Sequence, residues 1–527
     1  MSEMLKSSGG ISAATLTSRL LGLVREQVYA AFVGTTAIYG AFIFAYQVPN
    51  LFRRLLGEGA LTAAFIPIFK TKEKLEGEDA MWHSANAVIS GLIVVSLEVV
   101  LIAALIITML LLTLPWSPNS RLMLQLMRMM FPYTTLACVG AVFIGILNAR
   151  GHFFIPALGA AVLNVVMIAS VLFLAPHMGK HLDTQIFALA IGVLVAGVAQ
   201  ALFQVPTLRG EGFRYRWASP WHDPTVREVV HKMIPSTIGV AAFQINVMLT
   251  QGLAFGQSAR IIGEFQYAVR LMELPQGVFG ISLATFLLPT LSSFAVEKKF
   301  DHFRATLRQA VGHLVFVNLL ASVLLFTLAA PIVRLLFQRG KFDAHSTEVV
   351  SFALVCLVPG LVSFSLVNIL ARAFYALGDI LTPMRISIFC LAINLVFASV
   401  FLFVYHMGAG ALGIANTLSS TFNLALLAYA LRKKLRTLEM KETVAQFPLI
   451  GALALAAALI AWGLRLLWQS HIGHSNLPLR MGEVFVPMIT ATVFYFSTSY
   501  WLNAGSAREI LQLVASKARR QSANPRP

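Results

Sequence analysis

The sequence predicts an all-α integral membrane protein with about fourteen transmembrane helices, and three observations support this fold class. Of the 527 residues, 57% are hydrophobic and only 12% are charged, and the mean hydropathy is +0.76. Apolar runs long enough to cross a bilayer recur from one end of the chain to the other. The longest polar stretch, about residues 209–232, is too short to form a domain. These features exclude a soluble enzyme with a single membrane anchor.

Windows of about 19 residues locate the fourteen predicted helices. The second and the eighth are the weakest, because proline and polar residues interrupt their apolar runs. Interrupted helices are typical of a cavity wall, where one side of the helix meets water. The predicted spans are residues 10–33, 38–57, 84–114, 122–149, 153–176, 185–207, 229–254, 264–292, 310–336, 346–371, 380–405, 410–431, 446–469 and 484–504.

The net charge of +17 has two explanations. Nucleic-acid binding is one, but Lys and Arg residues that flank membrane spans and set their orientation explain the charge better. If the N-terminus is cytoplasmic, the cytoplasmic segments carry 27 Lys and Arg residues and the opposite segments carry 8. This asymmetry predicts that both termini are cytoplasmic. The first apolar run, residues 11–32, ends without a small-residue cleavage motif, so we expect no cleavable signal peptide.

The sequence predicts no metal, no cofactor and no catalytic nucleophile. The histidine pairs at 177/181 and 471/474 have the spacing of metal ligands but no cysteine or carboxylate beside them. Residues 408–413 match a dinucleotide-binding pattern, but no strand precedes them, so they predict a tight helix connection. Any energy source is therefore expected to be a coupling ion or the membrane potential. The cysteines lie in apolar spans and are expected to be small core residues: Cys138, Cys356 and Cys390.

An internal repeat predicts two related halves. Residues 60–67 resemble residues 282–289, and residues 147–156 resemble residues 374–383, at nearly equal offsets of 222 and 227. An offset of six helices would make the repeats parallel around a central cavity; chance similarity between Leu- and Ala-rich segments is the alternative. The predicted domains are an N-terminal lobe (1–222), a C-terminal lobe (223–440), a final helix pair (441–506) and a cytoplasmic tail (507–527).

Charged side chains inside the predicted spans are the main functional signal. A charge at the centre of a bilayer costs about 2.5–3.5 kcal/mol on insertion scales. These side chains must therefore face one another, a water-filled cavity or an anionic ligand, which predicts a cation-lined pathway. The residues are Arg19, Arg25, Glu26, Arg53, Arg270 and Glu273.

In the first span, Arg19 and Glu26 are seven residues apart and share a helix face, with Arg25 on its flank. Gly22 lies between them and permits close approach of a neighbour or a ligand. The alternative is ion pairing that only neutralises charge. Because one glutamate cannot offset two arginines, we favour an anion site.

In the second span, Asn50 follows a proline that interrupts the helix. Arg54 and Glu58 are four residues apart and are expected to pair. Arg53 points elsewhere, and it is either a ligand of the same anion or a flanking residue that sets topology.

In the eighth span, Arg270 and Glu273 are three residues apart and lie on one helix face. The internal repeat makes this eighth span, in the second half, the equivalent of the second span in the first half. Charges from both halves are therefore expected to converge on one cavity. Two isolated carboxylates, Glu98 and Asp379, are candidates for a coupling cation or proton, with an ordinary hydrogen bond as the alternative.

Four motifs together resemble the MurJ/MviN family of lipid II flippases, within the multidrug/oligosaccharidyl-lipid/polysaccharide exporter superfamily. They are residues 18–26 (SRLLGLVRE), 49–60 (PNLFRRLLGEGA), 270–275 (RLMELP) and 337–342 (FQRGKF). The resemblance runs in order over essentially the whole chain. It implies two six-helix lobes around a cationic cavity, a final helix pair that forms a groove for a lipid tail, and flipping of lipid II from the cytoplasmic to the outer leaflet by alternating access.

The resemblance also implies the roles of individual residues. It places the family's substrate-binding arginines at Arg19, Arg25, Arg53 and Arg270, and supporting acids at Glu26 and Glu273. It implies a bacterial cytoplasmic (inner) membrane protein that binds lipid II and membrane lipids, acts in peptidoglycan biosynthesis and meets the cell-wall synthesis machinery. The chain departs from the family pattern, which often has Asp, Lys and Asp, at three positions: Gly40, Gln47 and Val269.

Three other functions stay open. An exporter of another polyprenyl-linked glycan or of a drug has the same architecture, although drug exporters favour cavities in which acids outnumber bases. A membrane glycosyltransferase would need carboxylates or metal ligands in a large external loop, and the longest such loop, about residues 470–483, has only Glu483 near it. A scaffold of the cell-wall machinery is the third.

Overall fold

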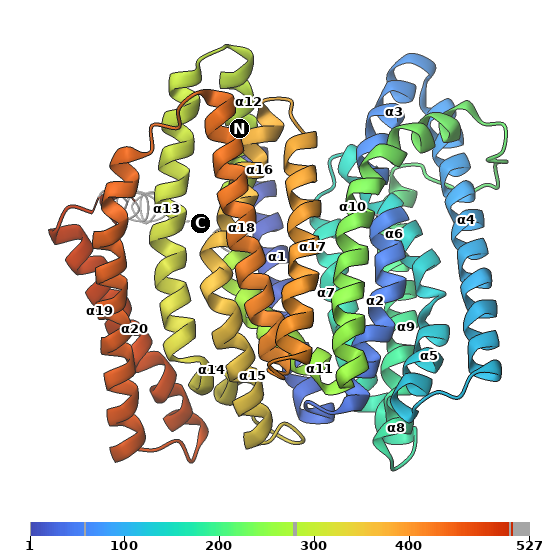
Figure 1. The fold of residues 1–527 in the computed structure, drawn as a ribbon. Helices are drawn as coiled ribbons and strands as arrows, with labels where there is room; N and C mark the ends of the chain where they lie inside the picture. The colour runs from blue at the N-terminus through green and yellow to red at the C-terminus, as the bar shows by residue number, and fades with distance from the viewer. Residues whose placement is uncertain (1, 57–59, 278–281, 505–506, 510–527) are drawn as a thin grey trace. The chain divides into compact units, whose positions relative to one another are not determined.

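The computed structural model describes residues 2–56, 60–277, 282–504 and 507–509. These residues form helices joined by short connections, and no strand occurs among them (Figure 1). The chain divides into two compact units. The first contains Met1–Gly263 together with Arg339–Phe342, and the second contains Glu264–Gln338 and Asp343–Pro527. The lobe boundaries that the repeat suggests stay a prediction.

The first unit holds ten α-helices and two short irregular turns among its described residues. The chain then enters α11 (Ala259–Pro275), which begins in the first unit and continues into the second. The elements are α1 (Ser2–Val33), α2 (Ala37–Leu56), α3 (Ala60–Glu76), α4 (Glu78–Thr113), α5 (Pro118–Met130), α6 (Tyr133–Ala149), α7 (Phe154–Ala169), the π turn η1 (Ser170–Leu174), the 3-10 turn η2 (Ala175–His177), α8 (Leu182–Gln185), α9 (Phe187–Gly210) and α10 (Pro224–Gln257).

The second unit holds the remaining helices. They are α12 (Ser282–Val296), α13 (Phe300–Thr327), α14 (Ala329–Phe337), α15 (Ala344–Leu357), the 3-10 turn η4 (Val358–Gly360), α16 (Leu361–Ala376), α17 (Leu381–Phe403), α18 (Ala409–Leu435), α19 (Lys441–His471) and α20 (Leu477–Trp501).

The prediction of a multi-span helical membrane protein is confirmed. Among the described residues, nine helical runs are long and apolar enough to cross a membrane, and a tenth is added if the bent pair α5–α6 counts as one. Each of the fourteen predicted spans overlaps at least one helix of the described residues. The count of fourteen crossings itself stays a prediction.

Two predicted spans are wrong in one respect, because they are not continuous helices. The span 122–149 breaks between α5 and α6, which meet at 43°. The span 310–336 is divided between α13 and α14. The span 264–292 includes residues 278–281, which lie outside the described residues, so its predicted interruption stays a prediction. Proline lacks the N–H that a continuous helix needs and clashes with the preceding turn. Each of these two breaks has a proline at or near it: Pro132 and Pro331.

The helix α3 has no counterpart among the predicted spans. Its first half is apolar and contributes side chains to the hydrophobic core, whereas its second half carries most of its charged residues. Two ion pairs along the helix, Lys70–Glu73 at 2.7 Å and Lys72–Glu76 at 2.6 Å, stabilise this polar end. A hydropathy window averages the two halves and therefore misses the helix.

Aromatic side chains organise the core of the first unit. Trp82 contacts Phe69 and Phe213, with ring centroids 5.7 and 5.6 Å apart, and Phe143 contacts Phe213 at 5.8 Å. These rings join α3, α4, α6 and the connection after α9. Edge-on and tilted aromatic pairs of this kind stabilise the fold beyond the contribution that burial of the rings makes.

The final helices α19 and α20 pack on α13 within the second unit. The Tyr495 ring lies 4.7 Å from that of Phe316, and its hydroxyl donates to the Phe316 carbonyl oxygen at 3.0 Å. A buried ion pair adds a second attachment. Arg334 on α14 donates to both carboxylate oxygens of Glu483 on α20, at 2.9 and 3.0 Å, and Gln469 on α19 donates to the same carboxylate at 2.7 Å.

Candidate functional site

The first span holds an arginine–glutamate pair inside the first unit. An Nη atom of Arg25 lies 2.5 Å from Glu26 Oε1, and the side chains are 17% and 4% exposed. The Tyr39 hydroxyl lies 3.3 Å from the other carboxylate oxygen. Glu26 therefore offsets the charge of Arg25 directly, rather than only sharing a helix face with Arg19.

The neighbouring helix α7 orients the Arg25 side chain. Asn164 Oδ1 accepts from the second Nη atom of Arg25 at 3.0 Å, and Asn164 Nδ2 donates to the Ser18 carbonyl oxygen at 3.1 Å. The guanidinium carbon also lies 5.6 Å from the centroid of the Tyr29 ring. A guanidinium held by an amide, a carboxylate and a ring has a fixed direction, as a binding site requires.

The second span holds Arg53 in a similar way. Its Nε atom donates to Asn50 Oδ1 at 2.8 Å, one turn earlier on α2. Arg19 and Arg53 are both partly buried, whereas Arg54 is exposed. The expected partner of Arg54, Glu58, lies outside the described residues, so their pairing stays a prediction.

The second unit carries the predicted pair on α11. Arg270 and Glu273 form an ion pair at 2.8 Å, and their side chains are 37% and 48% exposed. The two side chains therefore share a helix face, as their spacing predicts, and in addition they form an ion pair. The convergence of this pair with the arginines of the first unit in one cavity stays a prediction.

Sequence reasoning missed Asn164 and Tyr39 as parts of the site. Asn164 lies 139 residues from Arg25 in the chain, so only the folded contact between α1 and α7 joins them. A buried amide in an otherwise apolar span was the available signal, because such groups need a hydrogen-bonding partner.

Gly40, where the family pattern often has Asp, has a steric explanation within the first unit. A Cβ atom on Gly40 would lie 1.7 Å from the carbonyl oxygen of Ala259. The backbone of α2 thus approaches the first turn of α11 too closely for any side chain. An aspartate at this position would not fit the arrangement that the structure describes.

The motif at 337–342 forms a tight turn, and the part that belongs to the first unit packs on the end of α1. The Lys341 N–H donates to the Ala31 carbonyl oxygen at 2.9 Å. Gly34 and Gly340 have φ of +58° and +57°, and a Cβ on either would lie within 2.4 Å of a backbone oxygen. Both positions therefore require glycine.

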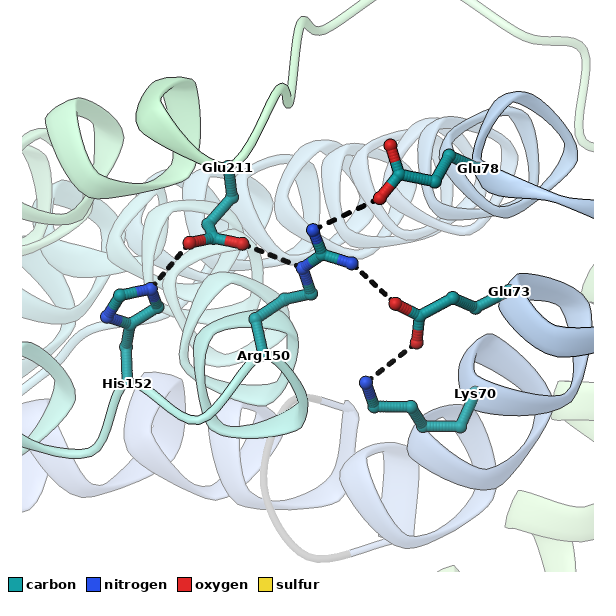
Figure 2. A network of polar contacts seen from close by, with 6 residues as sticks. All are labelled: Lys70, Glu73, Glu78, Arg150, His152 and Glu211. Atoms are coloured by element: carbon teal, nitrogen blue, oxygen red, sulfur yellow. Dashed lines mark hydrogen bonds and ion pairs between the residues drawn. The ribbon is translucent and has the colours of Figure 1, made fainter. Parts of the chain in front are cut away.

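A second polar network, also missed from sequence, lies at one end of the first unit (Figure 2). Arg150, which ends α6, contacts three carboxylates: Glu73 of α3, Glu78 of α4 at 3.2 Å, and Glu211 after α9 at 2.7 Å. His152 lies 2.7 Å from Glu211. Hydrogen bonds from His152 and from Arg150 lower the pKa of Glu211. The network ties the ends of four helical segments together.

The two isolated carboxylates have different surroundings. Asp379 accepts hydrogen bonds from Lys434 at 2.5 Å and from the Thr382 hydroxyl at 2.8 Å. Burial opposes ionisation, but these hydrogen bonds hold the pKa of Asp379 at about 2. It is a helix-capping residue rather than a free ion ligand. Glu98 is exposed on α4.

No cluster of three or more His, Cys, Asp or Glu side chains suited to a metal ion occurs among the residues that the structure describes. None of the three cysteines, which all lie among the described residues, forms a disulfide, and Cys138 and Cys390 are buried. The site is thus an arrangement of arginines, acids and amides, which can bind an anion through charge and hydrogen bonds.

Apolar spanning helices with partly buried arginines inside them define a polytopic membrane transporter. A family model described as lipid II flippase MurJ matches residues 29–481, and the chain belongs to this family. A relative from Vibrio cholerae, described as a probable lipid II flippase MurJ, is 32% identical over 88% of this chain and 91% of its own length. The lipid II flippase MurJ of Burkholderia cenocepacia is 33% identical over 80% of this chain and 83% of its own.

Solved structures share the fold. The chain superposes on a lipid II flippase MurJ in an inward closed conformation with a TM-score of 0.75 and 21% identity, covering 93% of this chain and 99% of that one. An inward-facing multidrug transporter of the MATE family and MOP superfamily gives a TM-score of 0.63 at 15% identity, covering 80% and 96%. The chain therefore shares its fold with both of these transporters.

Proposed function

We propose that this protein is a lipid II flippase, which moves the head group of the lipid-linked peptidoglycan precursor from the cytoplasmic to the outer leaflet. Membership of the MurJ family supports this function, as does the similarity to relatives described as lipid II flippases. The observation that carries the proposal is Arg25, a guanidinium held inside an apolar helix by Glu26 and Asn164. An arginine in this setting suits an anionic ligand that must pass through a membrane.

The chemistry of the substrate fits the side chains. Lipid II carries a pyrophosphate, a disaccharide-pentapeptide and a long polyprenyl tail, and guanidinium groups bind phosphate oxygens with two parallel hydrogen bonds. In this proposal Arg19, Arg25 and Arg270 hold the pyrophosphate. Arg53, positioned by Asn50, assists near the inner gate, with Arg54 and Glu58 in support.

The acids give a means of release. Glu26 and Glu273 each pair with a cation of the proposed site. A phosphate that binds must compete with these carboxylates, and a carboxylate that re-forms its pair helps to displace the phosphate. Alternating access then exposes the site to one side of the membrane and afterwards to the other.

We also infer where the protein lies in the cell and what drives its transport cycle. We place the protein in a bacterial cytoplasmic membrane with both termini cytoplasmic, as the Lys and Arg asymmetry predicts. No organic cofactor is required, and the membrane potential or a coupling ion drives the cycle. The final helix pair, α19 and α20, would guide the lipid tail, and the cell-wall synthesis machinery would receive the product.

The test is rescue of cells depleted of their own lipid II flippase. Charge-reversed variants Arg25→Glu and Arg270→Glu should insert at normal levels yet fail to support appearance of lipid II in the outer leaflet. The matched control is Arg128→Glu, which reverses an exposed arginine on α5 that donates to Thr108 and lies outside the proposed site.

Normal translocation by both site variants would exclude the cationic site. Translocation of a different polyprenyl-linked glycan, with none of lipid II, by purified protein in liposomes would keep the site but change the substrate. Loss of translocation in protein-only liposomes, with rescue in cells intact, would favour a scaffold.

A further inference from the structure

Glu98 is a charged residue in the middle of a long apolar helix. It is the only Asp, Glu, Lys or Arg between Asp79 and Arg121 in the sequence. At 1.5 Å per residue it lies about 30 Å from the start of α4 and about 22 Å from its end. The side chain is therefore too deep in the span for a short glutamate to reach either membrane surface.

The exposed side of α4 surrounds Glu98 with apolar side chains. Glu98 is exposed, and so are residues one turn before and one or two turns after it on the same helix face. These neighbours have exposed fractions of 43% (Val95), 68% (Leu101), 59% (Ile102) and 64% (Leu105). In a bilayer this stripe meets lipid or another protein.

Glu98 makes no hydrogen bond or ion pair with any residue that the structure describes, unlike other polar residues of α4. The Ser84 hydroxyl lies 3.2 Å from that of Thr225, and Asn86 donates to a backbone carbonyl oxygen at 3.2 Å. The Ser90 hydroxyl lies 3.1 Å from that of Tyr215. Each of these inward side chains makes at least one hydrogen bond, whereas the outward carboxyl of Glu98 makes none with the described residues. Intramembrane carboxylates are costly in lipid and almost always face a partner.

We infer that the Glu98 face of α4 is a docking surface for a transmembrane helix of another membrane protein, which places a basic side chain at the depth of Glu98. Charge complementarity identifies the partner's chemistry, because lipid tails offer no donor to a carboxyl. The flanking apolar stripe supplies the packing surface that a neighbouring helix needs. This inference does not depend on which lipid the protein transports.

A second copy of this chain fits the surface less well. In a symmetric membrane dimer each residue keeps its depth in both copies. The basic residue inside a predicted span on this side of the first unit, Arg128, donates to Thr108 of α4. Thr108 lies ten residues beyond Glu98, about 15 Å away along the helix. Symmetry therefore does not bring Arg128 to Glu98.

Labelling with a hydrophobic carbodiimide tests whether Glu98 is covered. Such reagents enter lipid and modify carboxyl groups there. The full-length protein should be modified at Glu98 in dilute proteoliposomes and protected in native membranes, and Glu98→Gln should lose the modification in liposomes. Equal modification in both settings, or none in liposomes, would overturn the inference.

Cross-linking identifies what covers the surface. A photoreactive amino acid at Leu105 should give a protein adduct in native membranes, and Glu98→Leu should abolish it. The same amino acid at Val195, a 50% exposed residue of α9, serves as the matched control and should react only with lipid. Mass spectrometry then identifies the partner protein in the adduct. Replacement of the partner's basic residue by an acidic one, in combination with Glu98→Lys, should restore the adduct. An adduct of twice the chain mass, or adducts with lipid alone at Leu105, would refute a foreign partner helix.

Discussion

The contacts of individual side chains determine which charged residues this protein accommodates inside an apolar helix bundle. Arg25 is tolerated because Glu26 offsets its charge and Asn164 accepts one of its hydrogen bonds. Three glycines have a different role, because they allow backbone segments to meet where a side chain would not fit: Gly34, Gly40 and Gly340. Charge pairing and close backbone contact thus occur within the same part of the first unit.

Substitution of Gly40 tests the close approach of α2 and α11. Gly40→Ala places a methyl group 1.7 Å from the Ala259 carbonyl oxygen, so we expect destabilisation of at least about 1–3 kcal/mol, the typical cost of overpacking. The readout is the thermal unfolding midpoint of the purified protein. Gly256→Ala on α10 is the matched control, because no atom lies within 4 Å of the added methyl. Equal midpoints for the two variants would contradict the described contact.

The Arg150 network predicts a pH dependence. His152 and Arg150 hold the pKa of Glu211 below its ordinary value of 4.5. A lowered folded-state pKa means that Glu211 contributes stability above about pH 4.5, and that this contribution is lost as the pH falls through the lowered folded-state pKa. Glu211→Gln should therefore cost about 0.5–1 kcal/mol at neutral pH, and the difference from the unmodified protein should vanish in acid.

Unfolding of both proteins across a pH series measures this effect. Glu228→Gln removes an exposed partner of Lys232 on α10 and is the control, with an expected change of a few tenths of a kcal/mol. A difference for Glu211→Gln that persists unchanged at low pH would show that the carboxylate charge is not the cause.

At the scale of helices, the sequence predicted where the apolar segments lie but not how they bend. Hydropathy is averaged over a window, so Pro132 could not be recognised as the position where α5 and α6 meet at 43°. For the same reason α3 was not predicted, because its apolar half and its charged half give an intermediate mean hydropathy. Within the site, Arg25 and Glu26 were predictable because charge in an apolar run is visible in one dimension. Their contacts with Asn164 and Tyr39 were not, because packing brings those side chains together.

Within the second unit, the packing of α19 and α20 on the other helices should depend on the buried ion pair between Arg334 and Glu483. Glu483 is fully buried, so Glu483→Gln leaves the Arg334 charge uncompensated, which typically costs about 3–5 kcal/mol. The double variant Arg334→Met/Glu483→Leu should recover most of that loss, since it removes both charges. Unfolding midpoints of the three proteins provide the measurement. A double variant no more stable than Glu483→Gln would show that the pair is not the source of the effect.

At the scale of the whole molecule, fold and family agree with the chemistry of the side chains. The chain shares its fold with a lipid II flippase and with a multidrug transporter, yet its proposed site is rich in arginine. A cationic site suits a pyrophosphate, whereas the opposite polarity would suit a cationic drug. Relative to the family pattern, the departures at Gly40 and Val269 each remove an acid, whereas the departure at Gln47 removes a base.

The most direct test of the cationic site is the affinity of the purified protein for lipid II, measured by native mass spectrometry. A charge-assisted hydrogen bond contributes about 1.5–3 kcal/mol, so Arg25→Gln should weaken binding by about tenfold or more. Arg128→Gln, which removes an arginine outside the site, should leave the affinity unchanged. Equal affinities for Arg25→Gln and the unmodified protein would contradict the claim that this guanidinium binds the pyrophosphate.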